Sequence, residues 1–299
     1  MRVKFWGVRG SIPAPSKHTV KYGGNTAAIE VRNNNDDLII IDAGTGIRLL
    51  GYSLLKEAKE KKNIEAMFLI SHTHWDHIQG IPFFVPLYIP NNNFEFVGPQ
   101  GTKRTLEEIF ELQMDHDYFP LNFSGLPSKT TFSQVLETTL KYKNFKIETK
   151  ILNHGNLGGV LGYKIEADNQ SIVYSSDHEG YEIFFETHSE KTINIIKKTE
   201  EKYHTFVNNA DLLIHDAQYD EEDYKKKRGW GHSSFDYAIN TALSSNVKLL
   251  SFIHYDPDYS DEKLDKIFEE CNLKLKNENH NLKIIPAYEG LELNLDDYK

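Results

Sequence analysis

The chain has 299 residues, 39% of them hydrophobic and 12% aromatic, and its formal net charge is −10. This apolar content is enough for a sizeable core, and the acidic balance disfavours a surface that grips long nucleic acid. The lone cysteine, Cys271, excludes both a disulfide framework and a cysteine-based metal site.

No linker-like stretch interrupts the chain, so we expect a single domain over residues 1–299. The first residues lack the apolar core of a signal peptide, and no apolar run approaches the length that crosses a membrane. The single cysteine also suits a reducing compartment. We therefore expect a cytoplasmic protein without a membrane partner.

Short apolar runs alternate along the chain with apolar residues at helical spacing. The runs predict strands over residues 3–6, 28–31, 38–41, 67–70, 171–174, 212–214 and 249–253. The helical spacing predicts helices over residues 47–58, 106–114, 235–243 and 264–271. Ser233 or Ser234 would cap the third helix, and residues 260–262 would begin the fourth. We assign core packing to these apolar stripes.

Residues 91–150 are less regular than the rest of the chain. They contain three consecutive asparagines and several prolines and glycines, and they include the run Asp-His-Asp-Tyr-Phe-Pro at 115–120. Long segments without regular patterns in a compact domain are often functional loops. We therefore expect an insertion or lid near the functional site.

The most informative motif is His72-Thr73-His74-Trp75-Asp76-His77, which directly follows the apolar run at 67–70. It places four metal-ligating side chains within six residues. A single ion cannot easily use all four, whereas two adjacent ions can share them, with His72 and His74 on one ion and Asp76 and His77 on the other. The spacing indicates a two-metal site rather than a structural zinc, which normally includes cysteine.

Three further candidate ligands, His154, Asp177 and His254, each stand just after an apolar run. Side chains at strand ends converge on one edge of a layered structure. With the motif they make five histidines and two aspartates, a set that suits two ions about 3.5–4 Å apart with one bridging carboxylate.

Simpler interpretations exist for several of these residues. Taken alone, His154 and His254 would be hydrogen-bonded core histidines, and Asp177 could be a capping residue. His215 and Asp216 could equally serve the site or only the core, while His116 and His178 are expected at the surface or in loops. Asp42 is expected to tighten the Gly-Thr-Gly turn at 44–46, and the basic run at 225–228 to be a solvated loop.

The motif at 72–77, followed in order by His154, Asp177 and His254, resembles the metallo-β-lactamase superfamily. The resemblance runs from about residue 3 to residue 293, and it implies an α+β fold, a four-layer αβ/βα sandwich with the metals at one edge. Carried over by position, the first metal would be held by His72, His74 and His154. The second would be held by Asp76, His77 and His254, and Asp177 would bridge the two.

Later motifs are similar to the branch that contains the tRNA 3′-endonuclease RNase Z and the cyclic phosphodiesterases. They are Asp-Leu-Leu-Ile-His-Asp-Ala-Gln at 211–218 and Gly-His-Ser-Ser at 231–234. The resemblance implies that His232 contacts the scissile phosphate and that an acidic residue, here Asp216, steadies it. The chain departs from the branch where Asp216 replaces the usual glutamate. It also departs because the basic arm that clamps tRNA is not apparent.

These features lead to one main hypothesis, a metal-dependent phosphodiesterase that acts on a small or cyclic phosphodiester. Two divalent ions, zinc by preference and manganese or iron as alternatives, would lower the pKa of a bridging water. Asp76 would orient this nucleophile, and His232 would assist the phosphate or the leaving oxygen. The alternatives are a tRNA 3′-processing endonuclease and a non-catalytic dimetal sensor of a ligand or oxygen. Relatives in the branch often form dimers, so a homodimer is expected.

Overall fold

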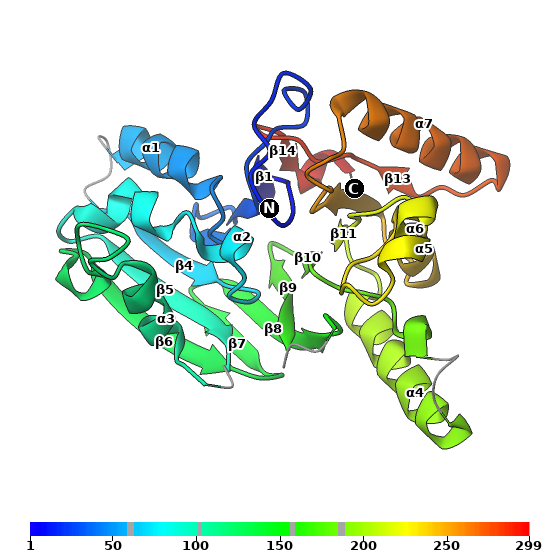
Figure 1. The fold of residues 1–299 in the computed structure, drawn as a ribbon, viewed down its shortest axis with the longest axis horizontal. Coiled ribbons are helices and arrows are strands. Elements are labelled where there is room, and N and C mark those ends of the chain that lie inside the picture. The colour runs from blue at the N-terminus through cyan, green and yellow to red at the C-terminus, as the bar shows by residue number, and fades with distance from the viewer. Residues whose placement is uncertain (59–62, 101–102, 156–158, 185–188, 299) are drawn as a thin grey trace.

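Two mixed β-sheets pack face to face at the centre of the molecule (Figure 1). The computed structural model describes residues 1–58, 63–100, 103–155, 159–184 and 189–298, and within these ranges each sheet has seven strands. The first sheet has the spatial order β14 (Glu292–Asn294), β1 (Arg2–Gly7), β2 (Ala28–Arg32), β3 (Leu38–Ile41), β4 (Glu65–Leu69), β5 (Asn93–Pro99) and β6 (Lys129–Val135). The second has the order β13 (Lys283–Ile284), β12 (Leu249–Ile253), β11 (Leu212–Asp216), β10 (Gln170–Ser175), β9 (Val160–Ala167), β8 (Phe145–Leu152) and β7 (Thr139–Tyr142).

Helices lie outside the two sheets and complete the expected four-layer αβ/βα arrangement (Figure 1). Beside the first sheet are α1 (Ile47–Ala58), α2 (Trp75–Ile78) and α3 (Leu106–Gln113). Beside the second are α4 (Glu190–Val207), α5 (Glu221–Lys227), α6 (Phe235–Ser244) and α7 (Asp261–Asn277). Among the described helices, none combines the length and the apolar character needed to span a bilayer.

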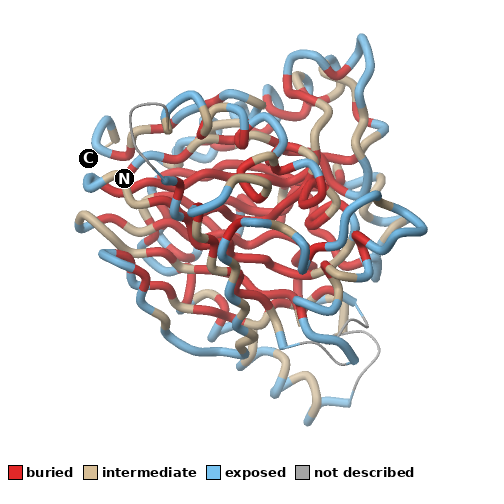
Figure 2. Tube along the Cα trace, turned by 90° about the vertical axis from the view of Figure 1, so that its left-hand side faces the viewer, coloured by how far each residue is buried: buried red, intermediate tan, exposed pale blue. Residues whose placement is uncertain are grey.

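Strand β3 illustrates why the sheets are buried on both faces. Side chains alternate along a strand, so Ile39 and Ile41 join the core between the sheets, while Leu38 and Ile40 join a second core under the helices of the first sheet. The sequence of a strand that is covered on both faces is therefore a continuous apolar run, without the alternation of apolar and polar residues. Figure 2 shows this burial as red tubes running through the middle of the molecule.

The predicted strands and helices are found in the structure, with small shifts at their ends. Ser234 caps α6 by accepting a hydrogen bond from the backbone N–H of Tyr237, and Ser260 caps α7 in the same way. Strand β4 ends at Leu69, one residue before the predicted end. The basic run at 225–228 was expected to be a loop, but its first three residues form the last turn of α5, where cations are favoured at the carboxyl end of a helix, and Arg228 follows the helix.

The expectation of an irregular insertion over residues 91–150 is wrong for most of that range. Its residues form β5 and β6 of the first sheet, β7 and most of β8 of the second, and helix α3. The strands are anchored by aromatic packing, because Phe96 stacks on Phe68 of β4 and on Phe132 of β6. Prolines and glycines between these short elements hid the regular pattern. Lid movement of the part around α3 stays a prediction.

Strand direction places the candidate site at one edge of the sandwich. Strands β10, β11 and β12 are parallel, with Ser175 paired to His215 and His215 to Phe252, so their carboxyl ends lie together. Strand β8 runs in the same direction, because β9 lies antiparallel to both β8 and β10. In the first sheet, β3 and β4 are parallel and end side by side. Residues that follow these strands therefore meet at one edge.

Candidate metal centre

The motif at 72–77 forms the loop between β4 and the short helix α2. His77 is anchored through its backbone, because its carbonyl accepts a hydrogen bond from the N–H of Ala43 at 2.7 Å. His72, Asp76 and His77 are all buried. The loop therefore presents its polar side chains to the interior edge rather than to solvent.

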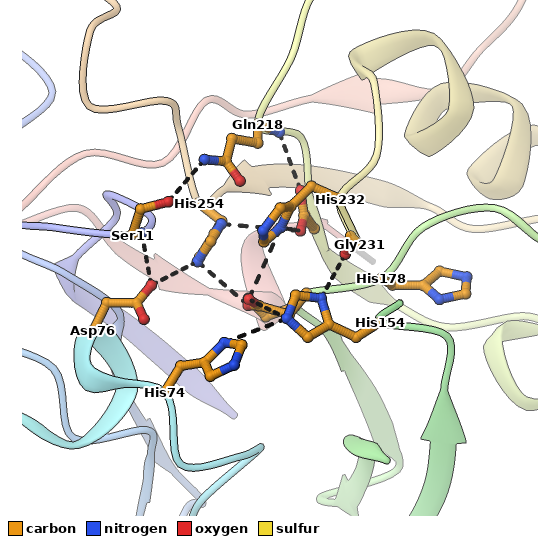
Figure 3. Close-up of polar contacts among 12 residues, drawn as sticks. Ser11, His74, Asp76, His154, His178, Gln218, Gly231, His232 and His254 are labelled. Atoms are coloured by element: carbon orange, nitrogen blue, oxygen red, sulfur yellow. Dashed lines mark hydrogen bonds and ion pairs between the residues drawn. The ribbon is translucent and has the colours of Figure 1, made fainter. Parts of the chain in front are cut away.

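Four side chains converge as one group: His72, His74, His154 and Asp177. Oδ2 of Asp177 lies 3.7 Å from Nε2 of His72 and 3.7 Å from Nε2 of His154. Nδ1 of His74 lies 3.4 Å from Nε2 of His154 (Figure 3). These are the residues that the sequence assigned to the first metal, together with the proposed bridge.

A second group contains Asp76, His77 and His254. Nε2 of His254 lies 3.0 Å from Oδ2 of Asp76, and the Nε2 atoms of His77 and His254 are 3.3 Å apart. Oδ1 of Asp177, the oxygen that faces away from the first group, lies 3.0 Å from Nε2 of His77 and 3.3 Å from Nε2 of His254. The carboxylate of Asp177 thus stands between the two groups, with one oxygen toward each.

Asp42 orients the second group and does not serve the turn that we expected. Its carboxylate accepts hydrogen bonds from His77 Nδ1 at 2.8 Å, from the Ser71 backbone N–H at 2.7 Å and from the Tyr174 hydroxyl at 2.5 Å. Asp42 holds the Nδ1 proton of His77, so Nε2 is the ring nitrogen that faces the second group. In the first group, Nδ1 of His154 donates to the carbonyl oxygen of Gly231 at 2.7 Å and leaves Nε2 free.

The geometry fits divalent cations. Nε2 of His72 is buried and has no hydrogen-bond partner in the part of the chain that the structure describes. The facing Nε2 atoms of His77 and His254 lie 3.3 Å apart, and carboxylate oxygens surround them. Buried polar atoms normally have partners. A cation in each group would satisfy these nitrogens, and imidazole with carboxylate is a common donor set for such ions.

The charges of the groups agree with this fit. Burial lowers the pKa of His72, His74 and His154, so all three imidazoles are neutral at neutral pH and offer lone pairs. Burial alone would raise the pKa of Asp177, but the imidazoles beside it, that of His254 first, bring it well below its ordinary value. Burial lowers the pKa of His254, but Asp177 and the other carboxylates around it raise the value to about 9. A bound cation would supply the positive charge that this proton supplies here.

His232 lies beside the two groups, and Asp216 is its hydrogen-bond partner. Nδ1 of His232 lies 2.8 Å from Oδ2 of Asp216 and 3.9 Å from Oδ2 of Asp177. The ring of His232 stacks on that of His254, with 4.9 Å between centroids (Figure 3). The shorter aspartate therefore reaches this histidine, although a glutamate is usual at its position.

A family model described as a beta-lactamase superfamily domain matches residues 38–255. This match spans more than half of the chain and includes both groups of candidate ligands. The chain belongs to the metallo-β-lactamase superfamily. The expected resemblance is thus confirmed, and the two mixed sheets with outer helices are the metallo-β-lactamase sandwich.

Individual relatives agree with this membership. Ribonuclease Z of Staphylococcus epidermidis is 22% identical over 311 aligned residues, which cover 91% of this chain and 94% of the relative. The short form of human tRNase Z superposes with a TM-score of 0.64 at 16% identity, covering 99% of each chain. A diphosphatase of the PhnP family superposes with a TM-score of 0.60 at 17% identity, covering 98% of this chain and 97% of its own. At these identities the solved structures establish the metallo-β-lactamase fold alone.

Glu179 is a residue of this metallo-β-lactamase site that the sequence analysis missed. Its carboxylate is fully buried and accepts the backbone N–H groups of Gly229 at 2.7 Å and Gly231 at 2.8 Å. Gly231 in turn holds His154 and precedes His232. The only signal in the sequence was its position two residues after Asp177.

Three other histidines can now be placed in the metallo-β-lactamase fold. His178, expected at the surface or in a loop, is fully buried, because it packs 4.3 Å from the ring of Tyr203 beneath the end of β10. His215 is also buried, with Nδ1 2.6 Å from the carbonyl oxygen of Asp216. His116 is exposed, as expected.

Three residues at the candidate metal site of this superfamily member also have an unusual backbone conformation. Asp42, Asp177 and His254 have φ angles of 57°, 51° and 64°, in the left-handed region that side chains other than glycine seldom adopt. Close packing adds to the constraint, since a Cβ on Gly10 would lie 2.3 Å from Nδ1 of His254. Such conformations persist only where the surrounding structure enforces them, and they cluster at functional sites.

Proposed function

We propose that this protein is a metal-dependent phosphodiesterase that hydrolyses a small or cyclic phosphodiester. One observation carries the proposal: the carboxylate of Asp177 faces two groups of imidazoles with separate oxygens, and the His232–Asp216 pair stands next to it. Two-metal sites of this kind serve in-line displacement at phosphorus. The superfamily membership of the chain supports the same reaction class.

The residues proposed to hold the cations are His72, His74 and His154 in one group and Asp76, His77 and His254 in the other, with Asp177 shared. A pair of ions bound there would lower the pKa of water, so that a nucleophile is available at neutral pH, and would neutralise charge on the phosphoryl oxygens. Zinc suits the imidazole-rich donors, and manganese or iron would also be accommodated.

His232 is the proposed proton donor to the leaving oxygen. Because Asp216 engages Nδ1, the remaining ring nitrogen, Nε2, is the one that can hold a proton for the substrate. The Asp216 carboxylate fixes the orientation of the ring, as an aspartate does in a catalytic triad. Asp216 is itself held by the backbone N–H of Gln218 at 3.1 Å.

Asp76 is the residue proposed to orient the nucleophile. Its Oδ2 accepts the backbone N–H of Ser11 at 2.7 Å, and the side-chain amide of Gln218 donates to the hydroxyl of Ser11 at 3.0 Å (Figure 3). These contacts hold the carboxylate in one orientation beside His254. Positioning of this kind is what converts a bound water and a phosphodiester into a reactive pair.

The test is an assay of protein purified with zinc or manganese, on bis(p-nitrophenyl) phosphate and on cyclic nucleotides. We expect phosphodiester cleavage that a chelator abolishes and that added metal restores. Protein that carries its full complement of metal and yet cleaves none of these phosphodiesters would contradict the proposal.

A second candidate is tRNA 3′ processing, and the coverage of the ribonuclease Z relatives favours it. The net charge of −10 opposes it, because association with tRNA depends on basic surface. Incubation with a precursor tRNA separates the two candidates. Cleavage at the 3′ end of the acceptor stem, faster than cleavage of small diesters at equal concentration, would favour the endonuclease.

A further inference from the structure

Three segments that are far apart in the chain meet beside the candidate metal centre, and Glu179 lies at their junction. The segments are residues 153–154 after β8, residues 177–179 after β10 and residues 229–233 between α5 and α6. Each carries one side chain of the site, which is His154, Asp177 or His232. The relative position of the segments therefore sets the geometry in which the proposed reaction takes place.

The carboxylate of Glu179 binds the backbone of the third segment with both of its oxygens. Oε1 accepts the N–H of Gly229 at 2.7 Å, Oε2 accepts the N–H of Gly231 at 2.8 Å, and the side chain is fully buried. N–H groups of residues i and i+2 that converge on one anion resemble the backbone concavities that bind phosphate. Here the anion belongs to the protein, so the loop is fixed to the segment after β10.

The backbone of Glu179 ties the same point to the first segment. Its N–H donates to the carbonyl oxygen of Asn153 at 2.8 Å, and the side-chain amide of Asn153 donates to the carbonyl oxygen of Glu179 at 2.9 Å. Asn153 directly precedes His154, and Gly231 directly precedes His232. Glu179 therefore holds the residue before each of these two histidines.

Gly231 transmits this constraint to both histidines. Its carbonyl oxygen accepts a hydrogen bond from Nδ1 of His154 at 2.7 Å (Figure 3). A Cβ at Gly231 would lie 2.4 Å from Nδ1 of His154, and its φ angle is 92°, so this position requires glycine. The rings of His154 and His232 lie 5.0 Å apart between centroids. A shift of the Gly231 backbone would therefore displace both rings.

We infer that Glu179 is a positioning residue, which holds His232 where it can donate a proton to the leaving oxygen. The inference rests on the proposed function for the role of His232. The Glu179 clamp, defined as the carboxylate of Glu179 with the N–H groups of Gly229 and Gly231, consists of protein groups alone and can be tested without metal. Glu179→Gln keeps the size of the side chain but turns an amide NH₂ toward one of the two N–H donors, which then loses its acceptor.

The first experiment uses two diesters that differ only in the leaving group, methyl phenyl phosphate and methyl p-nitrophenyl phosphate. Phenol is the weaker acid, so its oxygen depends more on a proton donor as it leaves. At saturating metal, Glu179→Gln should lower kcat/KM for the phenyl ester by at least about tenfold, since misplacement of a catalytic group by about 1 Å can cost about 100-fold. The loss on the p-nitrophenyl ester should be much smaller. Equal losses on the two esters would overturn the inference.

A double variant tests whether Glu179 acts through His232. In a His232→Ala background, Glu179→Gln should lower kcat/KM for the phenyl ester by less than about twofold, because residues that act as a unit are not additive. If Glu179→Gln caused its full loss in this background too, Glu179 would act other than through His232, and the inference would be wrong.

A variant of the loop leaves the carboxylate in place, so the test does not depend on the folding of Glu179→Gln. Gly229→Ala strains a φ angle of 89° at a position where a Cβ meets no described atom within 4 Å, and it should also affect the phenyl ester more than the p-nitrophenyl ester. Gly290→Ala is the matched control, because Gly290 has a φ angle of 90°, an equally open Cβ position and a place before β14. It should leave both esters unchanged, and equal losses in the two glycine variants would contradict the clamp.

The last experiment measures the clamp without chemistry. In metal-free protein, hydrogen–deuterium exchange in residues 229–233 should be at least about fivefold faster in Glu179→Gln than in wild type, because a buried N–H loses its acceptor. Faster exchange in a protein that cleaves no diester would support the clamp and contradict the proposed function, and with it the role in proton donation. Unchanged exchange in an active enzyme would overturn the clamp and leave the proposed function standing.

Discussion

The two sheets contribute to the candidate metal centre in different ways. The first sheet supplies His72, His74, Asp76 and His77 from one loop after β4. The second sheet supplies single residues, which follow the separate strands β8, β10 and β12. One half of the centre is therefore encoded locally, and the other half depends on correct strand pairing.

This difference has a physical consequence for the second half. Asp177, Asp216 and His254 meet because β10, β11 and β12 pair in parallel register. A slip of one residue in any strand would turn its side chains to the opposite face and move the ligand away from the others. The four ligands of the motif at 72–77 keep their positions relative to one another after such a slip, because they belong to one loop. Substitutions in the two halves should therefore differ in how far their effects extend.

The largest effect is expected at Asp177, where the two halves share a carboxylate. Asp177→Asn keeps the left-handed backbone, which asparagine tolerates, but removes the charge between the groups. Both metals should be lost, and activity should fall by about 10³-fold or more, since the ions are worth several kcal/mol at the transition state. The prediction is checked by measuring metal content with plasma mass spectrometry and turnover of a phosphodiester.

Asp76→Asn is the matched control for this substitution, because Asp76 belongs to the second group alone. It should cost the metal of that group and leave the other in place. If Asp177→Asn lost no more metal than Asp76→Asn, the shared role of Asp177 would be wrong.

The next effect is expected at His232, which lies beside the metals without being assigned to either. His232→Ala should keep the metal content and lower kcat by about 10²–10⁴-fold, the usual contribution of a general acid. Asp216→Asn should lower kcat less, because the ring remains present but loses its charged partner. Unchanged turnover in His232→Ala would remove this residue from the mechanism.

A smaller effect is expected at Asp42, which supports the locally encoded half from the end of β3. Asp42→Asn also keeps the left-handed backbone but weakens the hold on Nδ1 of His77. Partners of this kind are worth about 10–100-fold in metal affinity or activity. In a chelator titration, Asp42→Asn should release the metal of the second group at a lower chelator concentration than the wild type does. Tyr174→Phe is a milder variant at the same carboxylate. Identical metal affinities in wild type and Asp42→Asn would contradict the orienting role.

The smallest effect is expected at Asp223 of α5, which is not among the candidate ligands. Hydrogen bonds from Lys263 and Tyr259 lower the pKa of Asp223 to about 2. Because the folded value lies below the ordinary one, the stabilisation is present at neutral pH and is lost as the pH falls from about 4 toward 2. Asp223→Asn should destabilise the protein by about 0.5 kcal/mol at pH 7, a solvent-screened value, and the difference should vanish near pH 2.

Urea denaturation at several pH values measures this difference in stability. Glu222→Gln, at the adjacent and more exposed position of the same helix, is the control. A difference between wild type and Asp223→Asn that stays constant down to pH 2 would show that the charge of Asp223 contributes nothing. Activity should be unaffected in both variants.

Sequence patterns predicted the parts of this molecule that are coded by short-range periodicity. The buried run at 38–41 and the capped helix after Ser234 are examples, because apolar spacing and a capping serine are local properties. All seven candidate ligands could be found because each follows a strand end. Their division into two groups came from spacing and from the family resemblance.

Other features were not predictable because they depend on contacts between distant segments. Glu179 acts on the backbone of Gly229 and Gly231, fifty residues away, and no local pattern marks such a partner. Asp42 looked like a turn residue, because its contacts are made with distant parts of the chain, His77 in α2 and Tyr174 in β10. The strands within residues 91–150 are short and interrupted, so pairing with neighbours rather than propensity defines them.

The hydroxyl of Tyr174 reaches from the second sheet to Asp42 at the end of the first, and two neighbouring contacts also cross between the sheets. The hydroxyl of Tyr163 donates to the carbonyl of Ile70 at 2.7 Å, and the N–H of Leu161 donates to the carbonyl of Ser71 at 2.9 Å. These three bonds join the sheets at the edge that carries the ligands. During gradual denaturation, separation of that edge would release bound ions while the strands still give a native circular dichroism signal, so ion release would be an early reporter of damage to the sandwich.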